Sequence, residues 1–183
     1  MKRVILAAVT LISVAFVGTA NAQTPASTTV TVNIKLKPIH TIQVTGDDVV
    51  DLVYDSELKY ANGVPSSKAD QLSIFSTGAF EVKVKSTEFT NTGGAETIDA
   101  NTVKVTASKG SGNTLTLTAA PTVELSGSDQ LFIESAKGGR DLKFNVNYEG
   151  KGGDAYINKY SKNYNTPAEN IYTATVTYTL MAK

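Results

Sequence analysis

The stretch that decides the fold class is Tyr172-Thr173-Ala174-Thr175-Val176-Thr177-Tyr178-Thr179-Leu180, near the end of the chain. Apolar and polar residues alternate along it without a break, so that one face is apolar and the other carries only threonine. Because successive side chains of an extended strand point to opposite faces, this repeat is typical of a strand with one buried and one wet face. The sequence therefore predicts a long strand over 171–182.

The same two-residue repeat returns throughout the chain after residue 22, interrupted by clusters of Gly, Asn, Asp, Ser and Pro. No stretch has a convincing helical period. Further strands are predicted over 28–36, 41–45, 49–54, 71–76, 79–85, 102–107, 114–118, 130–134 and 140–148. About nine short strands at this spacing predict a single all-β domain over residues 23–183, an immunoglobulin-like β-sandwich.

Residues 1–22 have the composition of a bacterial export signal. Lys2 and Arg3 supply positive charge, the run Val4–Val17 is largely apolar, and Ala20-Asn21-Ala22 supplies the small residues that a signal peptidase needs. A membrane span needs about 20 apolar residues, more than this run holds. We therefore expect cleavage after Ala22, export into the periplasm and then to the cell surface or beyond, and no membrane anchor on the mature chain.

The cysteine count and the net charge limit which covalent bonds and which binding partners are expected. The sequence holds no cysteine, so neither an acyl anchor at the cleavage site nor a disulfide is expected. It holds 17 basic and 17 acidic side chains; cleavage removes two basic ones and leaves 161 residues with 15 against 17, a net charge of −2. A chain without a basic surplus is not expected to bind nucleic acid.

Residues suited to catalysis are scarce. A serine or cysteine nucleophile usually needs a base, and the one histidine is His40, just after the predicted strand break at Pro38. A structural histidine is the expected role there, and a zinc site lacks ligands for the same reason. We therefore expect no catalytic, metal-binding or cofactor-binding residues and a protein that is not an enzyme.

A cluster of carboxylates follows the strand predicted over 41–45. Its members are Asp47, Asp48, Asp51, Asp55 and Glu57. Oxygen ligands of this kind bind calcium, but the spacing lacks the Asp-x-Asp-x-Asp-Gly pattern and the closing Glu of an EF-hand loop. A carboxylate pair for glycoside hydrolysis and a simply solvated loop are the alternatives. The sequence leaves open whether this cluster binds calcium.

A segment rich in tyrosine and asparagine lies between residues 154 and 172. Tyr156, Tyr160 and Tyr164 occur there among Asn, Lys and Ser, without periodic aliphatic residues. Tyrosine rings give contact area at low entropy cost, and amides give adaptable hydrogen bonds. These three tyrosines are therefore candidates for contact with a host glycan or protein receptor, or they fold back on the sandwich edge. A secreted or periplasmic carbohydrate-binding module is the alternative function.

Both ends of the mature chain carry a resemblance to a known family. The start, Thr29-Val30-Thr31-Val32-Asn33-Ile34-Lys35-Leu36 and then Lys37-Pro38-Ile39-His40-Thr41-Ile42-Gln43-Val44, resembles a fimbrial major subunit of the chaperone-usher kind, particularly the cysteine-free class of enterobacterial colonisation fimbriae. The alternating stretch 172–180 is similar to the ending shared by those pilins and by related secreted coat and adhesin-like domains. The likeness covers these two terminal stretches only.

The resemblance implies an incomplete, pilin-like sandwich whose missing strand comes from the amino-terminal segment of the next subunit. Segment 28–36 would be the donor strand, with Val30, Val32, Ile34 and Leu36 filling the groove while its main chain completes an open sheet edge. The implied function is that of a structural subunit that polymerises by strand addition into a surface fibre or coat and serves adhesion. Other copies of the chain, a periplasmic chaperone and an outer-membrane usher are the implied partners. Pairing of the segment within its own sandwich is the alternative.

Overall fold

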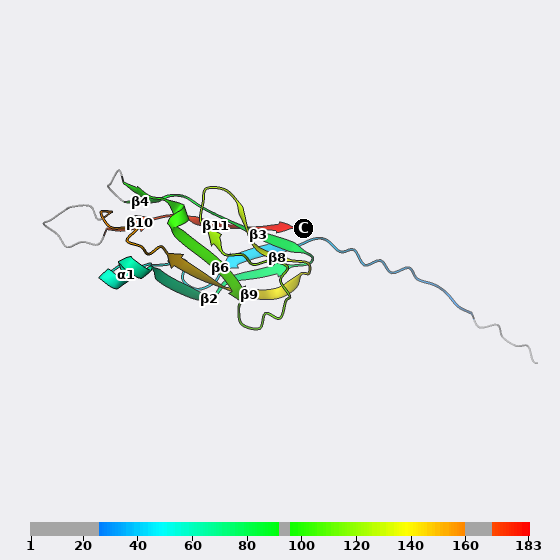
Figure 1. Ribbon diagram of the computed structural model, residues 1–183. Coiled ribbons are helices and arrows are strands. Elements are labelled where there is room, and N and C mark those ends of the chain that lie inside the picture. Colours follow the sequence, from blue (N-terminus) through cyan, green and yellow to red (C-terminus); the bar gives the residue numbers. More distant parts are fainter. Residues whose placement is uncertain (1–25, 92–95, 160–169) are drawn as a thin grey trace, which may run out of the picture. The chain divides into compact units, whose positions relative to one another are not determined.

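The computed structural model describes residues 26–91, 96–159 and 170–183, and the chain divides into one unit over 1–35 and a second over Leu36–Lys183. The second unit is almost entirely β-structure in antiparallel ladders (Figure 1). Within the described ranges, no helix has the length and apolar character of a membrane span. The export signal predicted over 1–22 lies outside the described residues.

Two antiparallel sheets form the body of the second unit. The larger has the strand order β1-β2-β9-β6-β7, and the smaller has the order β11-β3-β8. The bounds of the larger sheet's strands are His40–Val44 (β1), Val64–Ser76 (β2), Val103–Lys109 (β6), Val123–Glu124 (β7) and Gly139–Gly150 (β9). Those of the smaller sheet are Phe80–Ser86 (β3), Gln130–Ser135 (β8) and Val176–Ala182 (β11).

The remaining elements are short. A small sheet has the order β10-β4-β5, with β4 over Phe89–Asn91, β5 over Thr97–Ile98 and β10 over Tyr172–Thr173. The helix α1 spans Glu57–Asn62, and the 3-10 turn η1 spans Ala100–Thr102. Each is too short for its periodicity to be recognised in the sequence.

The two main sheets pack face to face around one apolar core. Val82 of β3, Phe132 of β8 and Phe144 of β9 are fully buried, so both sheets contribute to the same interior. The buried members of this core are Leu72, Ile74, Phe80, Val82, Val84, Ala100, Val103, Val105, Ala107, Val123, Leu125, Phe132, Ile133, Leu142, Phe144, Val146 and Tyr148. The fold is therefore an all-β sandwich, as the two-residue repeat predicts.

Most of the predicted strands are confirmed. Those over 41–45, 79–85, 102–107, 130–134 and 140–148 each match a strand to within one or two residues. The strand predicted over 71–76 starts earlier, at Val64, because β2 continues through polar residues that pair with β9. The stretch 171–182 splits into β10 and β11, because its two parts pair with different strands, β4 and β3.

Three predicted strands join no ladder in the described part of the chain: 28–36, 49–54 and 114–118, apart from a single bridge just after the last of them. Leu52, Leu115 and Leu117 nevertheless pack partly against the core. Alternation reports which side chains face the interior, but a ladder also needs a neighbouring strand at hydrogen-bonding distance. The strand predictions over 49–54 and 114–118 are therefore wrong.

A polar contact ties the two sheets together beside this core. The Tyr148 hydroxyl of β9 donates to Gln71 Oε1 of β2 at 2.9 Å and lies 2.8 Å from the Tyr178 hydroxyl of β11. Because the Tyr148 proton is committed to Gln71, Tyr178 donates to Tyr148. Burial raises the pKa of both phenols, so both keep their protons at neutral pH. Strand β11 is thereby fastened to the opposite sheet by hydrogen bonds.

We expect Tyr148→Phe to lower the free energy of unfolding by about 1–3 kcal/mol, because it leaves both Gln71 and Tyr178 without their partner. Tyr178→Phe keeps the acceptor of Gln71 satisfied and should cost less, about 1 kcal/mol. Urea unfolding of the mature chain measures both, and the double variant gives the coupling between the two hydroxyls. Tyr60→Phe, in α1, is the matched control, and equal effects in all three variants would contradict the proposed tie.

Candidate functional site

Two edge strands, one from each main sheet, lie close to each other. Strand β1 ends the larger sheet and β11 ends the smaller one. Some of their Cα atoms lie within 8 Å of each other, yet the two strands belong to different sheets and share no ladder in the described structure. The sandwich is therefore open to strand pairing along this side.

The direction of the main-chain groups of β11 follows from its contacts with β3. The Thr175 N–H donates to Thr87 Oγ1 at 3.0 Å, the Thr175 carbonyl accepts from Thr87 N–H at 3.1 Å, and Lys183 N–H donates to Ala79 O at 3.1 Å. Backbone groups of successive strand residues point in alternate directions. The odd-numbered residues therefore turn toward β3, and the even-numbered residues from 176 to 180 turn their N–H and C=O groups toward the open edge.

The side chains of these even-numbered residues face the core but are incompletely covered. Val176, Tyr178 and Leu180 are half-buried, whereas Val82 and Val84 of the neighbouring strand β3 are 0% and 1% exposed. Burial in β1 is similarly partial, since Ile42 is half-buried and Val44 is 48% exposed. The open edge thus presents unpaired main chain beside a partly uncovered apolar interior, which is what an added strand fills.

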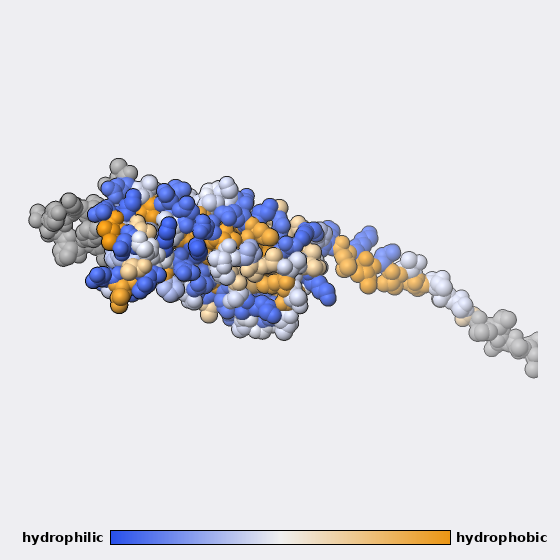
Figure 2. Space-filling model, in the orientation of Figure 1, coloured by the Kyte–Doolittle hydropathy of each residue, from blue (hydrophilic) through white to orange (hydrophobic). Residues whose placement is uncertain are grey.

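The segment 26–39 is extended and belongs to no strand of the described structure. Val30, Val32, Ile34 and Leu36 are 82%, 81%, 82% and 89% exposed. Figure 2 shows the apolar and polar side chains of this segment on opposite sides. The segment 28–36 therefore has the side-chain pattern of a half-buried strand without a sheet of its own.

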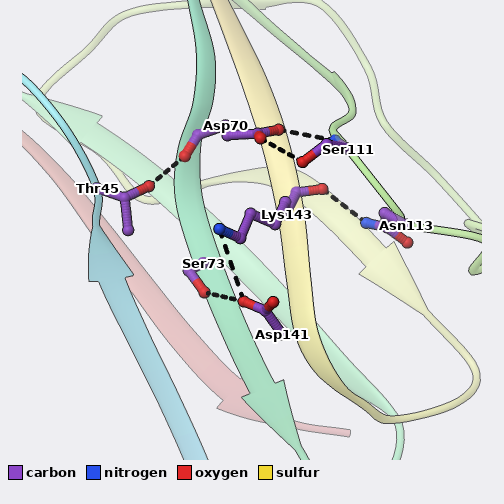
Figure 3. Close-up of polar contacts among 7 residues, drawn as sticks. All are labelled: Thr45, Asp70, Ser73, Ser111, Asn113, Asp141 and Lys143. Atoms are coloured by element: carbon purple, nitrogen blue, oxygen red, sulfur yellow. Dashed lines mark hydrogen bonds and ion pairs between the residues drawn. The ribbon is translucent and has the colours of Figure 1, made fainter.

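A polar cluster holds one end of β1 to β2 (Figure 3). The Thr45 N–H donates to Gln71 O at 2.7 Å, and its Oγ1 donates to the Asp70 carbonyl. Asp70 occupies a β-bulge with φ at +51°, a conformation that aspartate tolerates better than most residues. Its carboxylate accepts from the Ser111 N–H at 2.7 Å and from Ser111 Oγ. These hydrogen bonds, with a smaller contribution from Lys143, lower the pKa of the Asp70 carboxyl.

His40 fastens the other end of β1. Its Nδ1 lies 2.9 Å from Ser76 Oγ, and the Ser76 hydroxyl donates to the Gly78 carbonyl at 2.6 Å. Ser76 Oγ therefore accepts from Nδ1–H, which is the reverse of the proton transfer that a general base performs. Ser76 is also only 2% exposed. The pair links β1 to β2, which is the structural role predicted for His40.

The carboxylates between 47 and 57 do not converge on one point. Asp55 pairs with Lys59 at 2.7 Å, and this hydrogen bond lowers the pKa of its carboxyl. Asp47, Asp48 and Asp51 are exposed. Among the residues that the structure describes, no group of three or more His, Asp or Glu side chains is placed to hold a metal ion.

Tyr156 packs against the sandwich, whereas Tyr160 and Tyr164 lie outside the described residues. Its ring meets the Tyr54 ring edge-on with centroids 4.8 Å apart, and its hydroxyl donates to the Thr102 carbonyl at 3.1 Å. Tyr54 also contacts the Tyr60 ring, and burial raises the pKa of its phenol. Tyr156 is therefore half-buried in an aromatic cluster, as the fold-back alternative predicts.

Sequence analysis did not identify the residues of the open edge of β11 as functional residues. Its alternation identifies a strand, but the same pattern would arise in the middle of a sheet. Whether an edge stays open depends on which distant strands pair, and only the resemblance of the chain's two ends to pilins pointed to such an opening. Tyr54 and Tyr60 were missed for a similar reason, because a contact between a loop and a short helix leaves no periodic signal in the sequence.

We expect Asp70→Asn to flatten the acid dependence of stability. The folded-state pKa of Asp70 lies below the unfolded value of about 3.9, so its charge contributes stability that is present above about pH 4 and is lost as the pH falls through the lowered pKa. Asn tolerates positive φ but carries no charge. Urea unfolding between about pH 5 and pH 2 should give a steeper loss for the wild-type chain than for D70N. Ser111→Ala, which keeps the backbone donor, should fall between them; equal slopes for all three would show that the cluster contributes nothing.

Comparison of the chain with protein-family models and with curated proteins gave no match. What the chain does is therefore inferred from two features of its own structure. One is the extended apolar segment 28–36, and the other is the open edge formed by β1 and β11.

Proposed function

We propose that this chain is the structural subunit of a bacterial surface fibre or coat that polymerises by strand addition and serves adhesion. The observation that carries the proposal is the exposure of the four apolar side chains of segment 28–36, between 81% and 89%. Burying such a side chain fully is worth about 1.5–3 kcal/mol. Segment 28–36 alternates over nine residues but buries none of its apolar side chains, so the free energy of burial is not gained within one chain. This is the pattern of a strand that pairs with another copy.

The open edge supplies the complementary half of the proposal. Val176, Tyr178 and Leu180 combine unpaired main-chain groups with half-buried side chains, so an added strand gains hydrogen bonds and apolar contacts together. Each copy offers one donor segment and one acceptor edge. Repeated pairing therefore extends without limit, as a fibre requires.

Export fits the same proposal. Cleavage of the predicted signal after Ala22 would leave five residues, 23–27, before the donor segment, which would be free to pair with an edge. An open apolar edge is prone to aggregation during transit, which gives a periplasmic chaperone and an outer-membrane usher a physical role. The finished fibre would lie at the cell surface and contact a host glycan or protein.

We expect deletion of 28–36 to leave a folded, secreted monomer that forms no fibres, because the core lies entirely within the second unit. A synthetic peptide of sequence 28–36 should bind this deletion variant and raise its Tm. Electron microscopy and sedimentation of the purified mature chain measure assembly. Fibres that persist after the deletion would refute the proposal.

A matched pair of substitutions separates the two faces of the segment. Val32→Asp with Ile34→Asp places charges on the apolar side and should abolish assembly, because buried charges without partners are costly. Thr31→Asp with Asn33→Asp adds the same charges on the polar side and should leave fibres intact. Equal loss in both variants would mean that the segment acts through charge or flexibility rather than as a strand.

A further inference from the structure

Building on the proposed fibre, we infer that consecutive copies meet at a second contact, in which the end of the sandwich that carries α1 docks into two hollows at the opposite end of a neighbouring copy. The inference rests on the proposed function, because fibre growth brings the two ends together. It goes further than that function, since it joins surfaces other than the paired strands. The partner that it assigns is a second copy of this chain.

The two ends of the sandwich are the two ends of strand β2. Val64, which follows α1, pairs with Gly150 at one end, and Ser76 pairs with Gly139 at the other. The 12 steps from residue 64 to residue 76, at about 3.3 Å each, place these ends roughly 40 Å apart. In Figure 1, α1 lies at the opposite end of the second unit from the point where the chain enters it. A residue at one end therefore cannot touch the other end of its own copy.

Two adjoining hollows lie at the end of β2 that is remote from α1. The first, of about 750 Å³, lies between the segment 114–118 and the turn 136–140. The second, of about 560 Å³, lies between Lys37-Pro38 and the end of β2. The stretch 138–140 is a wall of both. Together the hollows form a broad concave surface at this end of the sandwich.

The wall that the two hollows share is fixed in place by its own contacts. The buried Ser135 hydroxyl donates to the Lys137 carbonyl at 2.8 Å and accepts from the Lys137 N–H at 3.2 Å. A Cβ at Gly138 would clash with the Ser76 carbonyl oxygen, so glycine alone lets the turn lie this close to β2. The turn is therefore held in shape before any partner arrives.

The opposite wall of the first hollow is anchored at both of its ends. Asn113 Nδ2 donates to the Lys143 carbonyl at 2.8 Å, and the Thr118 N–H donates to the Glu134 carbonyl at 2.8 Å. The two leucines between these anchors are half-buried and line the hollow. The hollow therefore has an apolar floor on a segment that is tied to both main sheets.

The rim of the hollows is positively charged. Lys37, Lys137 and Arg140 are exposed there, and among the residues that the structure describes no carboxylate lines either hollow. The Arg140 guanidinium lies 5.6 Å from the centre of the Phe75 ring, which holds it over the apolar floor of the second hollow. We call this surface the basic end and define it as residues 37–38, 75–77, 114–118 and 136–140. Its formal charge is +3.

The end that carries α1 has the opposite charge. We call it the acidic end and define it as residues 51–62 and 151–157. It holds four exposed carboxylates against two lysines, so its formal charge is 2 − 4 = −2. The carboxylates are those of Asp51, Asp55, Glu57 and Asp154, and the lysines are Lys59 and Lys151.

The acidic end also exposes large apolar side chains. Helix α1 has no buried residue; Leu58 is 72% exposed, and Ile157 of the neighbouring stretch is 51% exposed. The Gly153 N–H donates to the Ala61 carbonyl at 2.7 Å, and the aromatic cluster around Tyr54 joins the same two stretches. Leu58 is therefore an exposed apolar side chain on a braced support, with carboxylates beside it.

Charge and polarity favour the pairing of unlike ends. Two basic ends would set three positive charges against three, and two acidic ends would also repel each other, so only unlike ends attract. Leu58 and its acidic neighbours meet an apolar floor with a basic rim, which combines apolar burial with ion pairing. A contact between unlike ends is heterologous and repeats from copy to copy, as a fibre requires.

Strand addition brings the basic end to the surface of the neighbour. Lys37 follows segment 28–36 directly in the sequence and belongs to the basic end. The four steps from Leu36 to His40 span at most about 14 Å. A copy whose segment is paired on a neighbour therefore holds its own basic end close to that neighbour, and charge favours the acidic end as the part that it meets.

A zero-length cross-linker tests the contact in the mature wild-type chain. A water-soluble carbodiimide joins a lysine amine to a carboxylate only where the two groups touch. In fibres we expect amide links from Lys37 or Lys137 to Asp55 or Glu57, identified by mass spectrometry of the digested fibres. These groups lie at opposite ends of one copy, so such links join two copies. Fibres grown from mixed isotope-labelled and unlabelled chains should show links between the two kinds of chain.

Charge reversal tests whether the two ends attract each other. Lys137→Glu with Arg140→Glu makes the basic end negative, and Asp55→Lys with Glu57→Lys makes the acidic end positive. Each pair should slow fibre elongation about tenfold or more at low ionic strength, because complementary charge speeds association. The chain with all four substitutions restores the attraction and should regain most of the wild-type rate. Added salt should reduce the differences between the variants.

Lys85→Glu with Lys109→Glu is the matched control. Both residues are exposed, belong to neither end, and lie on β3 and β6. The double substitution changes the net charge as much as the pair at the basic end does, and it should leave the elongation rate unchanged. Urea unfolding of each variant shows whether it folds.

The outcomes separate the contact from strand addition. Links between copies, with recovery of the rate in the fourfold variant, support the contact. Fibres that grow without these links, or charge reversals that act no more strongly than the control, overturn the contact and leave strand addition standing. Fibres and links that both persist after deletion of 28–36 overturn strand addition and leave the contact standing. If the mature chain forms no fibres, both fail.

Discussion

The main-chain hydrogen bond is the interaction on which this structure depends. A chain without cysteine has no disulfide to hold it, so its sheets rely on ladders and on a shared apolar core. Strands β1 and β11 have a ladder partner on one side only, as do β7 and β8 at the other edges of the two sheets. In the proposed fibre, the unpaired main-chain groups of these edges would be satisfied by a strand from another copy, through the same hydrogen bonds that hold the sheets together.

Polar contacts hold the two edge strands β1 and β11 in position. His40 with Ser76 at one end, and Thr45 with the bulge at Asp70 at the other, bind β1 to β2. The hydroxyl pair of Tyr148 and Tyr178 holds β11 against the larger sheet. Each edge strand is therefore positioned from its inner side, and the outer side is left free. Polar contacts suit this role because they define orientation as well as proximity.

The sequence was sufficient to predict the fold class and five of the strands, because alternation follows directly from burial on one face. It was insufficient for segments such as 49–54 and 114–118, where apolar residues face the core without a ladder. Val32 and the other apolar residues of segment 28–36 are proposed as donor residues from their alternation and from the resemblance of the chain's start to pilins. The position of β11 at a sheet edge could not be predicted from the sequence, because an edge is defined by the strand that is missing beside it. Tyr156 was singled out by composition, but composition alone could not predict that its ring packs against Tyr54 in a half-buried aromatic cluster.

The hydrogen bond between Tyr148 and Tyr178 has a mechanical consequence for the proposed fibre. In the proposed fibre, tension would pull the added strand lengthwise past β11, so the hydrogen bonds between the two strands would be loaded in shear and would have to fail together. Strand β11 passes that load to β3 through a ladder of seven residue pairs and to the opposite sheet through Tyr178. The hydrogen bond between the Tyr148 and Tyr178 hydroxyls would then oppose sliding of β11 relative to the larger sheet. The force that such a fibre withstands in flowing liquid would depend on this hydrogen bond as well as on the added strand.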